Sequence, residues 1–331
     1  MIDANQITID IRSALQQAFQ RLRRAEVPSH TLSAELLLMH VSGKDRAWLY
    51  AHPEEQLDRA IAGEYVELVE RRCTGVPTQY LTGKQEFWGL EFEVSPAVLI
   101  PRPETEHVVE VALERLGHRE RRLSRPPDAR SMADGAGLTV ADVGTGSGCI
   151  AIALARELAH ATFYATDSSS AALEVARRNA SRHAVADRMQ FVQCHLLTGI
   201  PCRSLVTQPA GEPSGCSGRE LSGMSRRYRD LDLIVSNPPY IGRAERDGLQ
   251  REIRDHEPET ALYAGDQGTE LYAPLIRDSA ARLSPGGIVV LELGHNSVPV
   301  VRPLLEDSNW TDLVITNDLA GIPRVLAAER L

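Results

Sequence analysis

The sequence predicts an α/β fold, in which a mainly parallel sheet is covered by helices on both faces, preceded by a small helical domain. From about residue 101 onward, short apolar runs alternate with helical patterns, as in LTVADV, IAIALARELA, ATFYATD and AALEVARRNA. Such alternation is typical of strand-helix-strand units, whose successive strands lie parallel. The region from residue 7 to about 72 shows helical spacing and no strand pattern.

Residues 1–78 are expected to form the helical domain. Apolar residues from Leu15 to Leu22 recur at the spacing of one helix face. A second helix is expected in SAELLLMHVSG, where Gly43 suits a C-terminal cap, and a further one over residues 58–72.

Residues 79–100 differ in character, because Gly, Pro and Thr separate short alternating runs such as LEFEV. This pattern predicts a β-hairpin that links the two parts, after which residues 101–331 form the α/β domain. Two segments of that domain, 117–137 and 203–229, are rich in Gly, Ser, Pro and Arg and have little periodicity. We expect both to be mobile surface insertions. Their arginines could touch nucleic acid, although solvated loops are the simpler interpretation.

Composition narrows the class of protein. The chain has 331 residues, of which 43% are hydrophobic, and a formal net charge of −9. The acidic balance argues against a general nucleic-acid binder, because phosphate affinity comes largely from clustered Lys and Arg. No signal peptide and no apolar run of about 18 residues is present, so we expect a cytoplasmic protein. The five cysteines include no C-x-x-C pair, so neither a zinc site nor a disulfide framework is expected.

A glycine turn, DVGTGSG, lies between a predicted strand and a predicted helix. Glycines there let the backbone approach a ligand closely, and the following helix offers free N–H groups. Gly144, Gly146 and Gly148 give G-x-G-x-G, whereas a dinucleotide-binding turn has its third small residue one place later, where Cys149 stands. The spacing therefore favours a nucleoside ligand without a pyrophosphate, such as S-adenosylmethionine.

Asp167 ends the next predicted strand, ATFYATD. A carboxylate at this place can accept hydrogen bonds from both ribose hydroxyls of a nucleoside. The alternative is that Asp167 caps the helix that begins near SSSAALEVA. The glycine turn makes ribose binding the favoured interpretation.

The stretch NPPY follows the apolar run LDLIVS, so it ends the fourth strand of the predicted sheet. The side-chain oxygen of Asn237 and the backbone carbonyl of Pro238 could each accept one N–H of a planar NH2 group, and so aim its weakly nucleophilic lone pair. Pro238 and Pro239 stiffen the turn, and Tyr240 could stack on a flat amide or base. The alternative is a Pro-Pro loop that merely ends a strand.

At these residues the sequence resembles the PrmC/HemK family, the methyltransferases that modify the glutamine of the GGQ motif in peptide chain release factors. The resemblance extends over nearly the whole chain, through FWGLEFEVSPAVLIPRPETE, DVGTGSGCIAIALA, IVSNPPYI, HEPETAL and AGIPRV. It implies a Rossmann-like class I methyltransferase domain with a seven-stranded mixed sheet, and an N-terminal helical bundle that helps to dock the release factor. It also implies S-adenosyl-L-methionine as the cofactor. We further expect no bound metal, no direct nucleic-acid or membrane partner, and a monomer.

The same resemblance implies roles for particular residues. The target glutamine would be held by Asn237, Pro238, Pro239 and Tyr240. The cofactor would be contacted by Gly144, Thr145, Gly146, Ser147, Gly148, Asp167, His195, Leu196 and Asn237. In QCHLL, His195 stands where the family usually has an acidic residue that accepts from the adenine amine, and a neutral imidazole can accept the same bond.

Three other functions remain open from the residues. A ribosomal-protein glutamine methyltransferase and an adenine-amine methyltransferase would both use the chemistry of NPPY. The motif IPRPETE disfavours the first, and the acidic charge together with the lack of a base-recognition domain disfavours the second. A non-catalytic adaptor that binds partners through its helical domain is the alternative from a different class.

Overall fold

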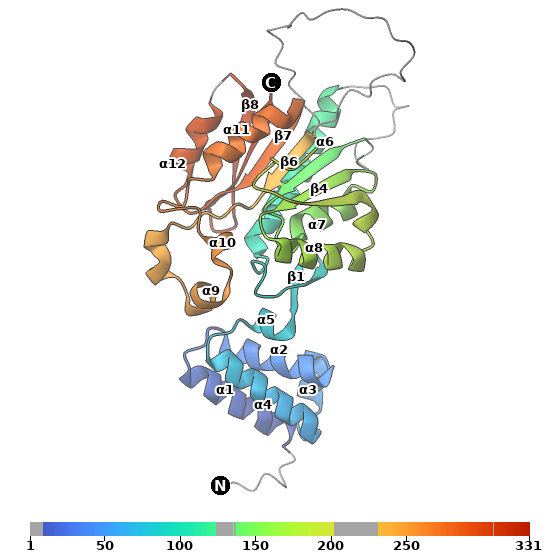
Figure 1. Ribbon diagram of the computed structural model, residues 1–331. Helices are drawn as coiled ribbons and strands as arrows, with labels where there is room; N and C mark the ends of the chain where they lie inside the picture. Colours follow the sequence, from blue (N-terminus) through green and yellow to red (C-terminus); the bar gives the residue numbers. More distant parts are fainter. Residues whose placement is uncertain (1–8, 124–134, 136, 202–230, 307) are drawn as a thin grey trace, which may run out of the picture.

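The protein consists of a helical bundle joined by a hairpin to an α/β domain (Figure 1). The computed structural model describes residues 9–123, 135, 137–201, 231–306 and 308–331. None of the helices within those residues is long and apolar enough to cross a membrane.

The N-terminal bundle packs three longer helices around one apolar core. The helices are α1 (Ile11–Arg24), α2 (His30–Ser42) and α4 (Arg59–Cys73), with the short α3 (Arg46–Ala51) and α5 (Thr78–Thr82) beside them. The inward face of α1 includes Leu15, Ala18 and Leu22, which the sequence spacing places on one side of the helix. Gly43 caps α2 in the left-handed conformation, with φ of 65°.

The β-hairpin of β1 (Lys84–Phe87) and β2 (Leu90–Glu93) follows α5 and precedes the α/β domain. Its buried rings, Phe87 and Phe92, belong to the core of the α/β domain and not to the core of the bundle. The hairpin is therefore anchored on the sheet side of the molecule.

The α/β domain contains a seven-stranded sheet, which confirms the expected mixed sheet. Its strands are β3 (Thr139–Val143), β4 (Thr162–Asp167), β5 (Met189–Gln193), β6 (Leu231–Ser236), β7 (Leu283–Glu292), β8 (Trp310–Asn317) and β9 (Pro323–Arg330). They lie in the order β5-β4-β3-β6-β7-β9-β8, parallel up to β7, after which β9 and β8 are antiparallel. The chain reverses its direction of winding between β3 and β6, and ligands bind open α/β sheets at such a switch point.

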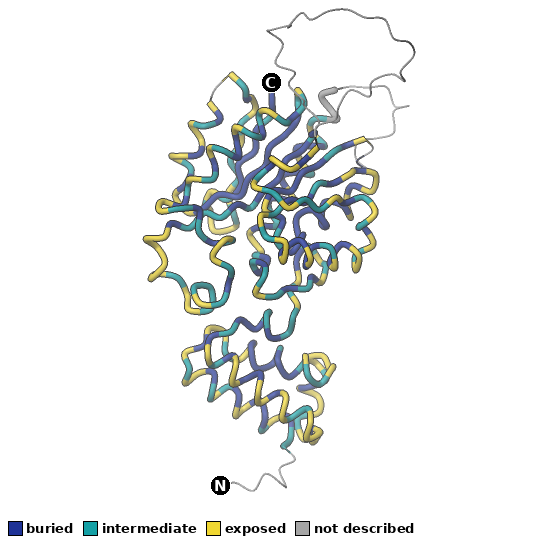
Figure 2. Tube along the Cα trace, viewed as in Figure 1, coloured by how far each residue is buried: buried dark blue, intermediate teal, exposed yellow. Residues whose placement is uncertain are grey.

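Helices cover both faces of the sheet, and Figure 2 shows that the strands are largely buried between them. One face packs against α6 (Glu106–Leu123) and α7 (Cys149–Glu157), and the other against α11 (Tyr272–Arg282). The remaining elements are α8 (Ser170–Arg182), α9 (Arg251–His256), α10 (Glu259–Leu262), α12 (Val298–Val301) and the 3-10 turns Pro103–Thr105, Ala186–Arg188, Arg243–Gly248 and Arg302–Leu305.

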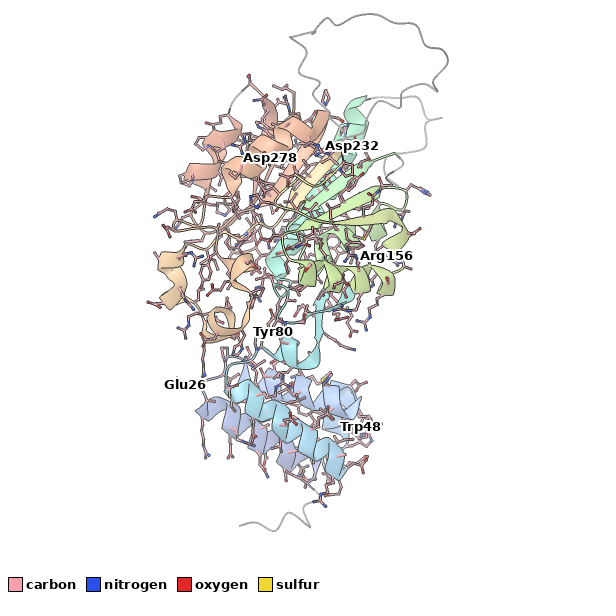
Figure 3. All side chains as sticks on the ribbon, in the orientation of Figure 1. Glu26, Trp48, Tyr80, Arg156, Asp232 and Asp278 are labelled. Carbon is pink, nitrogen blue, oxygen red and sulfur yellow. The ribbon has the colours of Figure 1, made fainter. Side chains whose placement is uncertain are left out.

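One expected insertion is wrong in its first part, because residues 117–123 continue helix α6. The helix passes Gly117, and Arg119 on its last described turns reaches Asp232 of β6 at 3.4 Å (Asp232 is labelled in Figure 3). Contact with the sheet thus stabilises a helical end that looks irregular in sequence. The rest of that segment, apart from Gly135 and Gly137, and the whole of 203–229 lie outside the described residues.

Candidate active site

A cavity of about 150 Å³ opens at the carboxyl ends of β3, β4 and β6. Val143 of β3 and Ser236 of β6 are paired in the sheet. The glycine turn and NPPY follow these two residues directly, so the switch point brings both motifs to the same cavity. Of the predicted site residues, those that line it are Gly144, Thr145, Gly146, Ser147, Asp167, His195, Leu196, Asn237, Pro238 and Pro239.

The glycine turn needs glycine for two different reasons. Gly144 and Gly146 have φ of 73° and 55°, and a side chain at either would meet no atom within 4 Å. Their backbone therefore faces open space in the cavity. Gly148 does not line the cavity; a Cβ there would lie 2.9 Å from Ile152 and 3.2 Å from Ala176, so its absence lets α7 and α8 pack closely.

Asp142 lies beneath this turn and was not singled out from sequence. It is fully buried, and its Oδ2 accepts hydrogen bonds from the Thr145 hydroxyl at 2.7 Å and from the Ala151 N–H at 3.2 Å. Burial raises the pKa of Asp142 to about 7, although both hydrogen bonds act in the opposite direction. The carboxylate thus ties the turn to the first turn of α7.

Asp167 faces the cavity and does not cap α8. The cap is Ser169, whose hydroxyl accepts from the Ala172 N–H at 3.2 Å. The Asp167 carboxylate instead accepts from the Gly146 N–H at 3.0 Å and from the Ser169 N–H at 2.9 Å. Because a carboxylate has about four acceptor positions, Asp167 can still accept from a ligand hydroxyl. Burial raises its pKa.

Asn237 has a fixed partner that sequence reasoning missed. Its Nδ2 donates to the hydroxyl of Thr105 at 3.0 Å, and Thr105 lies in the stretch IPRPETE. Both residues line the cavity. With one N–H of its NH2 group donated to Thr105, the amide has its oxygen available as an acceptor. The sequence signal for Thr105 was the motif itself, which carried the family resemblance but no assigned role.

Tyr240 lies behind the cavity wall rather than on it. Its hydroxyl donates to Glu292 Oε1 at 3.2 Å, and its side chain packs so closely on Gly294 that a Cβ there would lie 2.9 Å from the Tyr240 Cβ and 3.0 Å from its ring. Burial, followed by the charge of Glu292, raises the pKa of Tyr240. Stacking of Tyr240 on a substrate stays a prediction.

His195 and Leu196 form the side of the cavity after β5. Leu196 has a left-handed backbone, with φ of 51°, and its carbonyl accepts from the Thr166 hydroxyl at 3.0 Å. This bond fixes the loop that carries His195 against β4. The geometry thus brings His195 to the cavity, where its role toward an adenine stays a prediction.

A further wall comes from HEPETAL, whose Pro258, Thr260 and Ala261 line the cavity. The preceding residue, Glu257, forms a close ion pair with Arg102 of IPRPETE. The Glu257 side chain is 1% exposed, so its carboxylate is held away from water, whereas the Arg102 side chain is 29% exposed. Two motifs that sequence reasoning noted separately therefore meet across one wall of the cavity.

The cavity fits S-adenosylmethionine by the chemistry of its lining. Open backbone at Gly144 and Gly146 would accommodate the methionine part, and the Asp167 carboxylate would accept from ribose hydroxyls. Asn237 lines the same cavity, and its side-chain oxygen can accept from a substrate N–H. This arrangement can bind a nucleoside beside a primary amide and orient the amide nitrogen.

Comparisons with known proteins agree with this chemistry. Residues 13–83 match the family model described as PrmC N-terminal domain, and residues 134–209 match one described as Methyltransferase domain. A release factor glutamine methyltransferase of Koribacter versatilis is 39% identical over 320 residues, which cover 97% of this chain and 98% of that protein. Those of Nitratidesulfovibrio vulgaris and Moorella thermoacetica are each 38% identical over 97% of this chain, and the matches cover 95% and 98% of those proteins.

Proposed function

This chain belongs to the release factor glutamine methyltransferase family and is a methyltransferase, and from this premise we propose its substrate and cofactor. It transfers a methyl group from S-adenosyl-L-methionine to the side-chain amide nitrogen of the glutamine in the GGQ motif of a peptide chain release factor. The protein acts in the cytoplasm as a monomer, and the N-terminal bundle helps to dock the release factor.

The hydrogen bond from Asn237 to Thr105 is the observation that carries this proposal. It leaves the Asn237 oxygen as an acceptor, and Asn237 and Pro238 both line the cavity. Two acceptors on one rigid turn suit the two N–H groups of a primary carboxamide, such as a glutamine side chain. They do not suit a substrate that receives the methyl group on a hydroxyl, because a hydroxyl has only one proton to donate.

Orientation is the chief contribution of the chain to the reaction. The lone pair of an amide nitrogen is delocalised, so it reacts only when it is held in line with the group to be transferred. Asn237 and Pro238 would hold that nitrogen, and their oxygens would stabilise the positive charge that develops on it. When bound, S-adenosylmethionine supplies an activated methyl group.

The cofactor would be bound by residues that follow or end strands β3, β4 and β5. Gly144 to Gly148 would form the turn around its methionine part, Asp167 would accept from the ribose, and His195 with Leu196 would border the adenine. The positions of these residues on the cavity support the assignment, except that Gly148 would act by shaping the turn.

A labelling experiment tests the proposal. The protein, labelled S-adenosylmethionine and a folded, unmodified release factor should yield one methyl group on the GGQ glutamine, located by mass spectrometry. Asn237→Ala should lower kcat on the order of 100-fold or more while cofactor binding persists. Asn317→Ala, at an exposed position that ends β8, is the matched control and should keep wild-type turnover. Label in a ribosomal protein or in DNA, or no cofactor binding at all, would instead support one of the alternative functions.

A further inference from the structure

The proposed function requires the Asn237 amide to present its oxygen, and not its NH2 group, to the substrate. An amide can rotate by half a turn with little change of shape, so something must select one orientation. Resting on the proposed function, we propose that Glu292 and Thr105 are positioning residues, which together fix the orientation of Asn237 for methyl transfer.

The three residues come from distant parts of the chain; Asn237 and Thr105 line the cavity, and Glu292 does not. Thr105 ends the 3-10 turn of IPRPETE and is 2% exposed, and Glu292 ends β7 and is fully buried. Thr105 accepts from Asn237 at 3.0 Å. Glu292 interacts with the hydroxyls of Thr105 and Tyr240, and the Tyr240 bond measures 3.2 Å. The buried carboxylate thus supports both the first and the last residue of NPPY.

The direction of these hydrogen bonds follows from the charge of Glu292. An ionised carboxylate can only accept, so a hydroxyl that faces it must donate its single proton toward it. The Thr105 oxygen then has only acceptor positions left, and these can pair with the Asn237 NH2 group but not with its oxygen. The Asn237 oxygen is therefore directed to the cavity. A wrong orientation would bring an NH2 group against the NH2 group of the substrate.

The surroundings of Glu292 set the pH range in which this selection operates. Burial raises the pKa of Glu292 to about 7, the Thr105 and Tyr240 hydroxyls and the charge of Arg324 lower it, and Glu104 raises it. Tyr272 of α11 and Cys149 of α7 also lie within its electrostatic reach. Because the ionised form selects the orientation, kcat should fall as the pH falls through about 7.

Two substitutions at Thr105 separate hydrogen bonding from packing. Thr105→Val keeps the shape of the side chain but removes the hydroxyl, and it should lower kcat on the order of 10- to 100-fold. Thr105→Ser keeps the hydroxyl and should restore most of the rate. Calorimetry should give both variants an affinity for S-adenosylmethionine close to that of the wild type, because the glycine turn and Asp167, which would make most of the cofactor contacts, are unchanged. Equal kcat for the Val and Ser variants would overturn the proposal.

Glu292→Gln tests the charge itself and does not depend on the folding of the Val variant. A Gln amide can donate to Thr105, which lets the Thr105 hydroxyl donate to Asn237 and reverses the orientation. We expect a lower kcat, little change in KM for the release factor, and loss of the fall in kcat as the pH drops through about 7. Asp142 titrates in the same range, so a fall that persists in this variant would belong to Asp142 and would overturn the role of Glu292.

The wild-type enzyme distinguishes the two proposals. Methyl transfer to the release factor by the wild type, with unchanged kcat in Glu292→Gln, would refute the positioning role alone. Absence of transfer by a wild-type protein that binds S-adenosylmethionine would refute the proposed function and, with it, the role of Glu292 and Thr105.

Discussion

Replacement of Asp142 by Asn should make the stability of the protein less dependent on pH. Asp142 is fully buried below the glycine turn, and its Oδ2 accepts from Thr145 and Ala151. The oxygen of an Asn side chain can accept both of these bonds, so the substitution removes the charge while it retains the contacts. Its effect should therefore report the cost of a buried charge rather than the loss of the turn.

The magnitude follows from the pKa of Asp142. A rise from 3.8 to about 7 makes the ionised form about 4 kcal/mol less favourable in the folded protein, at about 1.36 kcal/mol per pKa unit. The folded state then binds more protons than the unfolded state between these two values. The stability that this group contributes is thus fully present below pH 3.8 and is lost as the pH rises through about 7. Linkage across that interval gives a loss of about 2–3 kcal/mol between about pH 5 and about pH 8 in the wild type.

Urea unfolding followed by circular dichroism at about pH 5 and about pH 8 measures this difference. The free energy of unfolding of Asp142→Asn minus that of the wild type should be larger at about pH 8 than at about pH 5, by about 2–3 kcal/mol. The matched control is Asp58→Asn, at an exposed helix N-cap whose side chain makes no capping bond. If the free energy of unfolding of Asp142→Asn changes with pH as much as those of the wild type and the control do, the reasoning is refuted.

Two further predictions concern the junction between the domains and the glycine turn. Arg72→Met removes an ion pair of 2.5 Å between α4 and Glu252 of α9. It should lower the free energy of unfolding by about 1–3 kcal/mol, a loss that is limited because Glu252 remains partly hydrated. The matched control is Arg71→Met, at an exposed position, and a loss of stability in the control equal to that of Arg72→Met would contradict this. Gly144→Ala should weaken S-adenosylmethionine binding more than it lowers the melting temperature, whereas Gly148→Ala, whose Cβ would meet Ile152 at 2.9 Å, should do the reverse. Calorimetry and thermal unfolding of both variants check the contrast.

The elements with regular local patterns were predicted correctly from sequence. The runs that became β3 to β7 are short, apolar and followed by turns or helices, so they read as buried strands of a parallel sheet. The antiparallel pair β8 and β9 was not recognised from its own residues. Strand β8 is largely exposed or half-buried, and its pairing with β9 contains register shifts, so its apolar pattern is weak. Only the sheet, which places β9 against β7, shows why these residues are extended.

The sequence predicts the parts of the candidate site that a single motif forms. It does not predict the contacts that residues of two distant motifs make with each other. The glycine turn, Asp167 and NPPY each follow a strand, and the switch point between β3 and β6 is enough to bring them together. Thr105 follows no strand and lies 132 residues before its partner Asn237, and Glu292 ends a strand but belongs to no recognisable motif. Their roles depend on the direction of hydrogen bonds, which composition and spacing do not specify.

Contacts between residues far apart in the sequence also connect the N-terminal bundle to the cavity. Tyr80 of α5, labelled in Figure 3 between the two domains, donates to the carbonyl of Val98 at 2.6 Å, and Val98 lines the cavity. On the other side, Arg72 holds α9 through Glu252, and the residues that follow α9 form another cavity wall. Because the bundle is bonded to two segments that line the cavity or lead into its lining, a shift of the bundle should also move residues around the substrate. If a release factor docks on the bundle, its position should therefore be defined relative to Asn237 before the glutamine enters.

Arg72→Met should then raise KM for the release factor more than KM for S-adenosylmethionine, and an equal rise in both would contradict this coupling.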